Sequence, residues 1–308
     1  MQLDWLGRSN PVAVWWCFLL VVSAGNIAFL LLLFSRRRAA DNGSRRGGIF
    51  AVEPLLLLAA VYVLVCAFRS VLPRADVQRI CLFDTWLSSV AVGRSVATVA
   101  EICFVVQWAI VLRELGRLTN SDTARVVSKL VVPLIVLAEC CSWYAVITTS
   151  YLGNVAENSL WTAAFALIGL ALVRLIHRFH GIVRGVIAAA AAGVAGYVVF
   201  MCTVDVPTYV ARWQADMTAG KRLFGLFSGL RDVATHWVVT HDIAGWDGEI
   251  AWMSLYFSMA VWASLLLAGF GLVKHLLPRY RVRVPLPTRV PLPAAVPLTL
   301  VLRHNKTQ

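Results

Sequence analysis

The stretch VVPLIVLAECCSWYAVITTS, residues 131–150, is almost entirely apolar but carries a carboxylate, Glu139, near its middle. About 20 apolar residues in a row are what an α-helix needs to cross the hydrocarbon core of a bilayer. A charged side chain at the centre of such a helix costs about 2.5–3.5 kcal/mol on insertion scales, and it persists where it faces the interior of a helix bundle. The stretch therefore predicts a membrane-spanning helix with a polar inner face.

The rest of the chain repeats this apolar pattern in blocks. Of its 308 residues, 59% are hydrophobic and 14% are charged, whereas soluble domains contain about 25% charged residues. The sequence therefore predicts an all-α, multi-pass integral membrane protein that forms a seven-transmembrane-helix bundle. The expected spans cover residues 11–35, 49–73, 93–115, 129–150, 158–178, 182–204 and 250–275.

The net charge of +12 comes from basic residues that lie between the apolar blocks. Nucleic-acid binding would need these residues gathered on one soluble face, so we expect no nucleic-acid partner. Lys and Arg remain on the cytoplasmic side of membrane proteins, which predicts an outside amino terminus and a cytoplasmic carboxyl terminus. The basic loops contain Arg36, Arg37, Arg38, Arg45, Arg46, Arg113, Arg117, Arg125, Lys129, Arg174, His177, Arg178, His180, Arg184, Lys274, Arg279, Arg281 and Arg283.

Two further regions stand apart from the spans. Within the transmembrane domain, residues 1–276, the outer segment 205–249 is long enough to form an interfacial helix or a cap over the bundle. Residues 277–308 repeat the motif V-P-L, and closely spaced prolines favour an extended, disordered cytoplasmic tail. The apolar residues with roughly helical spacing in the outer segment are Leu223, Phe224, Phe227 and Leu230.

Two carboxylates lie deep inside the predicted spans, away from their ends. Glu101 is seven residues from the outer end of its span near Arg94, and Glu139 is eleven residues from Ser150. These separations correspond to depths of about 10 Å and about 16 Å. The two spans follow one another in the chain and are joined by a short loop, so we expect antiparallel contact and facing carboxylates. Arg94, Thr98 and Glu101 share one helical face, so Arg94 could instead neutralise a carboxylate.

Other polar residues are expected at the same outer level. They predict a polar pocket that opens to the outside, although they also fit a structural network or ordinary residues at the water boundary. The candidate binding residues are Arg94, Glu101, Glu139, Ser142, Glu157, Asp205, Glu249 and Tyr256.

The motifs of common cofactor and metal sites are missing from the sequence. No histidine lies in the middle of a span, and no Cys/His metal spacing, P-loop or dinucleotide-binding glycine pattern occurs. We therefore expect no cofactor and no metal site, and the sequence does not identify catalytic residues or the oligomeric state.

Three hypotheses for the function remain open at this point. The first is binding or transport of a small solute, cation or proton, because intramembrane carboxylates commonly serve such pathways. The second is an intramembrane enzyme that acts on a lipid or lipid-linked substrate by carboxylate acid/base chemistry. The third is a membrane scaffold or receptor subunit. The expected partners are the lipid bilayer and a small solute or lipid ligand.

Overall fold

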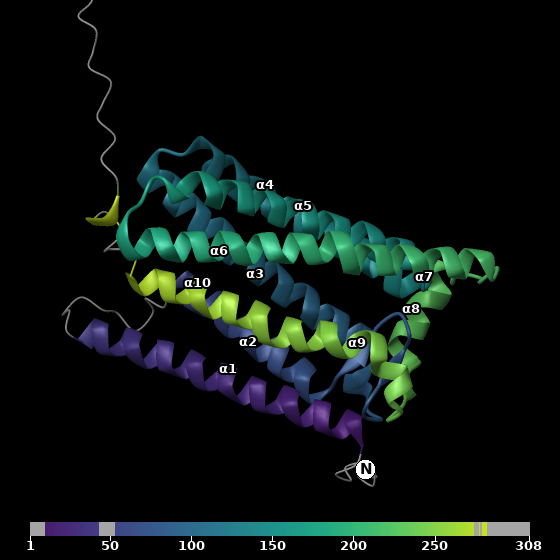
Figure 1. Ribbon diagram of the computed structural model, residues 1–308. Coiled ribbons are helices and arrows are strands. Elements are labelled where there is room, and N and C mark those ends of the chain that lie inside the picture. The colour runs from purple at the N-terminus through teal and green to yellow at the C-terminus, as the bar shows by residue number, and fades with distance from the viewer. Residues whose placement is uncertain (1–9, 43–52, 274–276, 278, 282–308) are drawn as a thin grey trace, which may run out of the picture.

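The computed structural model describes residues 10–42, 53–273, 277 and 279–281 as a bundle of long helices (Figure 1). Within these ranges, seven helical segments are long and apolar enough to cross a membrane, which confirms the predicted number. The first five are α1 (Pro11–Asn42), α2 (Pro54–Val71), α3 (Val90–Thr119), α4 (Asp122–Thr148) and α5 (Tyr151–Ile176). The sixth combines α6 (Gly181–Phe200) with α7 (Val206–Thr218), and the seventh combines α9 (Ile243–Leu255) with α10 (Val261–Val273).

Several span boundaries differ from the predicted ones because capping residues extend the helices beyond their apolar runs. The fourth helix begins at Asp122 rather than near residue 129, and the Ser121 hydroxyl accepts a hydrogen bond from the Ala124 N–H group. The Ser89 hydroxyl caps the third helix in the same way. Such a cap satisfies an otherwise unpaired N–H group and fixes the start of a helix whatever the hydropathy of the first turn.

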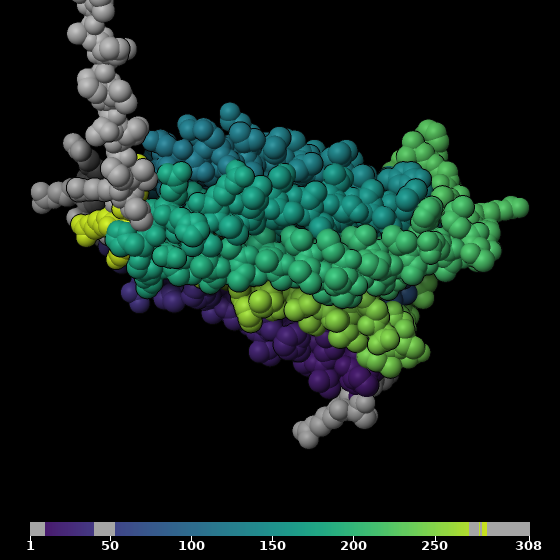
Figure 2. All heavy atoms as spheres, turned by 45° about the horizontal axis from the view of Figure 1, so that its top comes forward, coloured from purple at the N-terminus to yellow at the C-terminus, as the bar shows by residue number. Residues whose placement is uncertain are grey.

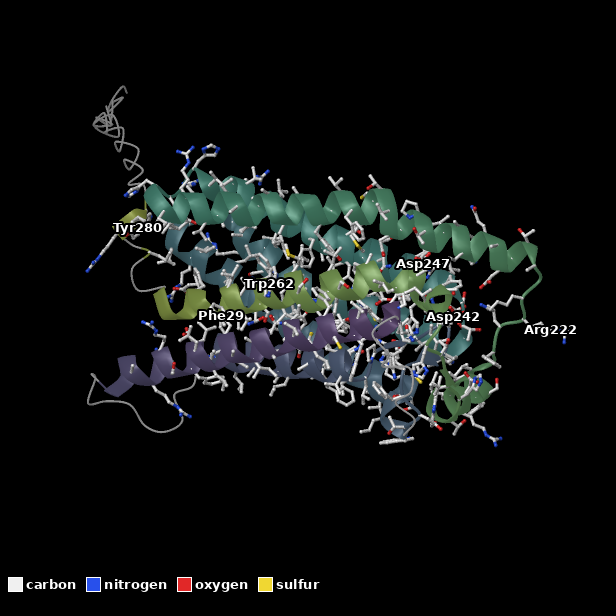
Figure 3. All side chains as sticks on the ribbon, turned by 60° about the horizontal axis from the view of Figure 1, so that its bottom comes forward. Phe29, Arg222, Asp242, Asp247, Trp262 and Tyr280 are labelled. Carbon is white, nitrogen blue, oxygen red and sulfur yellow. The ribbon has the colours of Figure 1, made fainter. Side chains whose placement is uncertain are left out.

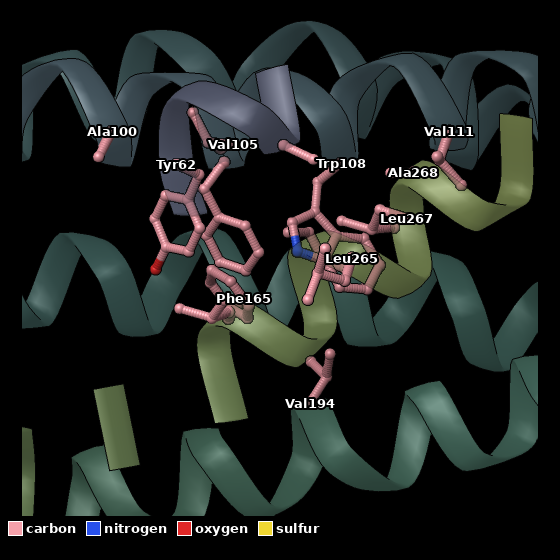
Figure 4. Close-up of a cluster of buried hydrophobic side chains, with 14 of the residues drawn as sticks. Tyr62, Ala100, Val105, Trp108, Val111, Phe165, Val194, Leu265, Leu267 and Ala268 are labelled. Carbon is pink, nitrogen blue, oxygen red and sulfur yellow. The ribbon is translucent and has the colours of Figure 1, made fainter. Parts of the chain in front are cut away.

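The centre of the bundle is packed with aromatic side chains (Figure 4). The Tyr62 and Phe104 rings stack with their centroids 5.0 Å apart, and the Trp108 and Phe165 rings meet edge to face at 6.2 Å. Close helix contact depends on Gly153 of α5, where an added Cβ would lie 2.7 Å from the Cys141 carbonyl oxygen of α4. The α4–α5 contact is the most extensive helix pair in the described chain, and it positions the side chains considered below.

Two π-helical turns interrupt the sixth and seventh spans, at Met201–Asp205 and Tyr256–Ala260. A π turn breaks the regular hydrogen-bond ladder and leaves backbone groups that need other partners. In the second turn, the Asn26 amide of α1 donates to the Phe257 carbonyl at 2.9 Å, and Trp262 donates to Asn26 at 3.0 Å. The turn is therefore stabilised by its neighbours, and it places Tyr256 toward α3.

The outer segment 205–249 is mostly helical. Its first part, α7, continues the sixth span, and Figure 2 shows α6 and α7 running together to the end of the molecule. A separate helix, α8 (Leu226–Thr235), follows, so Leu223 and Phe224 precede the predicted helix rather than belonging to it. Helix α8 rests on α4, since a Cβ added to Gly229 would overlap the Ile147 carbonyl oxygen. Phe227 on its other side is 86% exposed.

A small sheet that the all-α prediction did not include joins this end of the bundle. Strand β1 (Arg74–Ala75) pairs antiparallel with β2 (Ile80–Cys81), which pairs parallel with β3 (Val238–Val239). A short 3-10 helix, Trp86–Ser88, then leads into α3. Buried Arg79 ties the region together, because it donates to Asp232 of α8 at 2.7 Å and to the Val146 carbonyl of α4 at 2.6 Å.

The start and the last described residues of the chain lie at opposite ends of the bundle. Helix α1 begins at the end that carries α8 (Figure 1). At the other end, the His180 N–H group donates to the Tyr280 carbonyl at 2.9 Å. Figure 3 shows the same separation between Asp242 and Asp247 on one side and Tyr280 on the other. Most of the predicted tail, residues 277–308, lies outside the described residues.

Candidate functional site

Three helices bring acidic side chains to a single arginine. Arg94 and Glu101 lie two turns apart on α3, and Arg94 Nη2 is 2.6 Å from Glu101 Oε2. The same nitrogen is 2.6 Å from Glu139 Oε2 of α4, and Arg94 Nη1 is 3.7 Å from Glu157 Oε1 of α5. All four side chains are buried. We call these four residues the carboxylate cluster.

Neutral hydrogen-bond donors surround the cluster. The Thr98 hydroxyl donates to Glu139 Oε2 at 2.6 Å, and Trp143 Nε1 donates to that hydroxyl at 3.2 Å. From the π turn of the seventh span, the Tyr256 hydroxyl donates to Glu101 Oε1 at 2.9 Å. These donors hold the carboxylates in fixed orientations.

Two features show that the cluster is not fully satisfied by the described residues. One oxygen from each of Glu101, Glu139 and Glu157 lies within 4.8 Å of the other two. Among the described residues, none hydrogen-bonds to the buried Glu139 Oε1. Buried polar atoms are nearly always hydrogen-bonded, so an unpaired carboxylate oxygen calls for a specific explanation.

A second polar group lies around Glu249 at the α8 end. Glu249 accepts hydrogen bonds from Gln78 at 2.8 Å and from Arg212 at 3.3 Å. The Arg212 guanidinium lies over the Tyr151 and Tyr209 rings, 5.7 and 5.4 Å from their centroids. A cavity of about 380 Å³ is lined by Gln78, Tyr151, Arg212, Ala215, Asp216, Ala244, Gly245, Gly248 and Glu249.

Two further pairs of hydrogen-bonded polar side chains lie near these sites. Asn158, the residue after Glu157, donates to Asp205 Oδ2 at 2.5 Å. Arg74 donates to Asp76 Oδ1 at 2.7 Å and to the Val90 carbonyl at 2.9 Å. Burial raises the pKa of Asp76, but the Arg74 guanidinium and more distant arginines outweigh it, so the pKa lies below the ordinary value of a carboxyl group. Asp76 is therefore ionised at neutral pH and balances Arg74.

The eight residues predicted from the sequence thus do not all meet at one site. Arg94, Glu101, Glu139 and Glu157 form the carboxylate cluster, and Tyr256 contacts it directly. The remaining three lie nearby: the hydroxyl of buried Ser142 is beside Glu157, Asp205 is paired with Asn158, and Glu249 borders the cavity.

Sequence reasoning missed Arg74, Asp76, Gln78 and Arg212, which surround the cavity or the pairs between the two groups. Three of these residues belong to the stretch LPRADVQRI, residues 72–80, which is unusually rich in polar groups for a connection between two apolar spans. That composition was the available signal. No sequence signal pointed to Arg212. The predicted sixth span ended at residue 204, whereas Arg212 lies on α7, which continues that span.

Comparison with known proteins supplies no relative: no protein-family model, no curated protein and no solved structure matches this chain. The case for a function therefore rests on the geometry and charge of the residues described above.

Proposed function

We propose that this chain is an integral membrane protein with an outside amino terminus, whose carboxylate cluster binds a cation or protons from the outer side. Seven helical segments in the described part of the chain have the length and apolarity of membrane spans. Arg174 of α5 donates to Thr123 of α4 at 2.6 Å, so two basic loops adjoin each other at the end opposite α8. Because basic loops remain in the cytoplasm, the α8 end faces outward in this proposal.

The observation that carries the proposal is the charge balance of the cluster. Three buried carboxylates surround one guanidinium, so the four groups sum to −2 when all are ionised. An uncompensated buried charge costs several kcal/mol even after relaxation of the protein. A cation or protons must therefore neutralise this negative charge. If the cation or protons exchange with solvent, the cluster can perform binding or transport.

The neighbouring charges do not remove this deficit. Arg74 pairs with Asp76, and Arg212 pairs with Glu249, so each of these pairs is neutral by itself. Arg69 is a further cation, with its guanidinium carbon 5.9 Å from the centroid of the Tyr256 ring, and it reduces the deficit only from a distance. The positive charge that completes the cluster is supplied from outside the chain in this proposal.

The cavity beside Glu249 gives a means of access. It lies at the α8 end, where α7 and α9 meet, and it contains charged groups of both signs. Glu249 on its wall accepts a hydrogen bond from Gln78, which belongs to the same loop as the Arg74–Asp76 pair. A hydrated cation would lose part of its water shell here before it reaches the buried carboxylates.

The test uses purified protein in lipid nanodiscs. Titration calorimetry with Na⁺, K⁺, Mg²⁺, Ca²⁺ and Mn²⁺, together with proton uptake after a small drop in pH, measures which positive charge the chain accepts. We expect binding of at least one of them, weakened by Glu139→Gln and by Glu101→Gln. The matched control is Glu114→Gln, which changes a carboxylate on α3 that pairs with the exposed Arg117. If neither ions nor protons bind in a way that depends on Glu101 or Glu139, the proposal is wrong.

Flux assays then separate binding from transport. Proteoliposomes that contain the protein should accumulate the bound ion when a gradient is imposed, and the Glu139→Gln protein should not. Binding without accumulation would assign the chain a sensing or receptor role instead.

A further inference from the structure

We infer that the carboxylate cluster holds one divalent, oxygen-preferring cation, coordinated by Glu101, Glu139 and Glu157. This inference rests on the proposed function and narrows it to a ligand class. It also departs from the expectation of no metal site, which considered histidine and cysteine spacing. Carboxylate ligands from three separate helices have no such spacing in the sequence, so only the folded chain brings them together.

The size of the cluster matches a coordination sphere. One carboxylate oxygen from each of the three glutamates lies within 4.8 Å of the others. Calcium–oxygen distances are about 2.3–2.6 Å, so ligands on opposite sides of the ion are about 4.6–5.2 Å apart. Magnesium needs shorter distances, about 2.0–2.1 Å, and regular octahedral geometry. A separation of at most 4.8 Å accommodates either ion. Mg²⁺ loses its water shell reluctantly and is seldom held by protein carboxylates alone, which favours Ca²⁺, and Mn²⁺ as a similar oxygen-binding ion, over Mg²⁺.

An independent observation is the unpaired oxygen of Glu139. Its residue is only 3% exposed, and its Oε2 atom accepts from both Arg94 and Thr98, whereas Oε1 has no hydrogen-bond partner among the described residues. A buried acceptor without a partner costs free energy that a bound cation would recover. The carboxylate thus has one oxygen held by the protein and one available as a ligand.

The charge balance agrees with a divalent ion. Three carboxylates and one guanidinium sum to −2, which one divalent cation would neutralise. Arg94 acts in this site as a positioning residue, because its two terminal nitrogens approach all three carboxylates and hold them together while the ion is exchanged. Two protons would balance the same charge, and the experiment must separate the two cases.

The experiment measures equilibrium binding of radioactive Ca²⁺, and competition by Mn²⁺ and Mg²⁺, to the full chain in nanodiscs after treatment with a chelator. We expect one Ca²⁺ per chain, displaced by Mn²⁺ more readily than by Mg²⁺. Glu139→Gln should weaken binding by about tenfold or more, a loss comparable to those seen when metal-site residues are altered. Glu139→Asp keeps a carboxylate and should bind with intermediate affinity, whereas Glu114→Gln should leave binding unchanged.

A second measurement places the ion. Trp143 reaches the cluster through its hydrogen bond to Thr98, which donates to Glu139. Tb³⁺ bound at the cluster should therefore show luminescence sensitised by tryptophan excitation, and Trp143→Phe should reduce the emission per bound Tb³⁺. Emission that is unchanged in Trp143→Phe would place the ion elsewhere and overturn the inference.

The remaining outcomes distinguish this inference from the proposed function. If the wild-type chain binds no divalent cation but takes up protons that the Glu139→Gln chain does not, the divalent site is wrong and the proposed function survives. If it binds neither divalent nor monovalent cations and takes up no protons in a way that depends on Glu101 or Glu139, both are wrong. One Ca²⁺ per chain, lost in Glu139→Gln and retained in Glu114→Gln, supports both.

Discussion

Two buried polar residues on α3, Glu101 and Gln107, differ in how completely their side chains are hydrogen-bonded within the protein. Gln107 donates to the Leu55 carbonyl at 3.0 Å and to the Ser264 carbonyl at 3.3 Å, and its side-chain oxygen accepts from the Ser264 hydroxyl at 2.7 Å. Every part of its amide is paired, and the network is neutral. Such a closed network fixes how α2, α3 and α10 pack, and it leaves no bonding capacity for a ligand.

The carboxylate cluster around Glu101 is open by comparison. It has a surplus of negative charge, and Glu139 Oε1 is buried without a hydrogen-bond partner among the described residues. The contrast suggests a physical criterion for buried polar groups in this bundle. A network that is complete within the protein serves structure, whereas one with an unpaired carboxylate oxygen and surplus negative charge is a candidate for binding a cation.

The largest effect on stability is expected from Arg94→Gln. This change leaves three buried carboxylates without their central cation, and breaking a buried charge network from one side typically costs about 3–5 kcal/mol. Thermal unfolding of the purified protein in detergent at neutral pH checks this expectation. Arg117→Gln is the control, because that side chain is 75% exposed. Equal stability of Arg94→Gln and wild type would mean that the glutamates are already neutral.

The next largest effect is expected from Gln107→Met, which keeps the side-chain volume but removes the hydrogen bonds to α2 and α10. Leaving buried partners unsatisfied costs about 1–3 kcal/mol, so the unfolding temperature should fall. Cation binding at the cluster should stay as in wild type, because the closed network is separate from the cluster. A variant that unfolds normally but loses cation binding would contradict the distinction between the two networks.

Most of the bundle could be predicted from hydropathy, because each span is a long apolar block that must bury its backbone hydrogen bonds in a helix. The helix ends were harder to predict from hydropathy, since the caps at Ser89 and Ser121 depend on single hydroxyl groups. The π turn at Tyr256–Ala260 could not be predicted, because it depends on an amide from α1 that is distant in the sequence. The small sheet likewise requires residues 80 and 238 to meet.

The candidate site was predictable to the extent that it follows helical periodicity. Arg94 and Glu101 share a face of one helix, so their contact follows from their spacing. Glu157 lies just outside the predicted fifth span, residues 158–178, yet it is buried beside Arg94 because α5 packs tightly on α4 at Gly153. Asp76 and Gln78 lie in a hairpin whose position is set by tertiary contacts, so no local pattern could assign them to the site.

A smaller effect is expected from Asp76→Asn, which weakens the charge-assisted bond from Arg74 without adding volume. We expect a loss of about 1–2 kcal/mol, as for other hydrogen bonds to charged groups. The pH dependence has a definite sign, because the folded protein lowers the pKa of Asp76. Its contribution is complete above the unfolded pKa of about 3.9 and disappears as the pH falls through the lower folded value.

The measurement for Asp76 is the difference in unfolding free energy between wild type and Asp76→Asn across a pH series. The difference should be constant from about pH 7 to pH 5 and should shrink only below about pH 4. Using the difference removes the effects of other carboxylates, which are common to both proteins. A difference that changes between pH 5 and pH 7 would show that Asp76 is coupled to the carboxylate cluster rather than paired with Arg74 alone.

The smallest effect on stability is expected from Glu139→Gln, although it alters a carboxylate that accepts bonds from both Arg94 and Thr98. The change weakens the bond from Arg94 but also removes one negative charge from a cluster that has too many. These opposing terms should cancel to within about 1 kcal/mol, since replacing part of a buried ionic group by a neutral one is often tolerated.

The sharper readout for Glu139→Gln is stabilisation by Ca²⁺, which follows from binding to the folded state alone. Ca²⁺ should raise the unfolding temperature of wild type and of Gln107→Met but not of Glu139→Gln. If Glu139→Gln instead destabilises the protein as much as Gln107→Met, and Ca²⁺ stabilises neither wild type nor variant, the cluster is a structural network of the same kind as the one around Gln107.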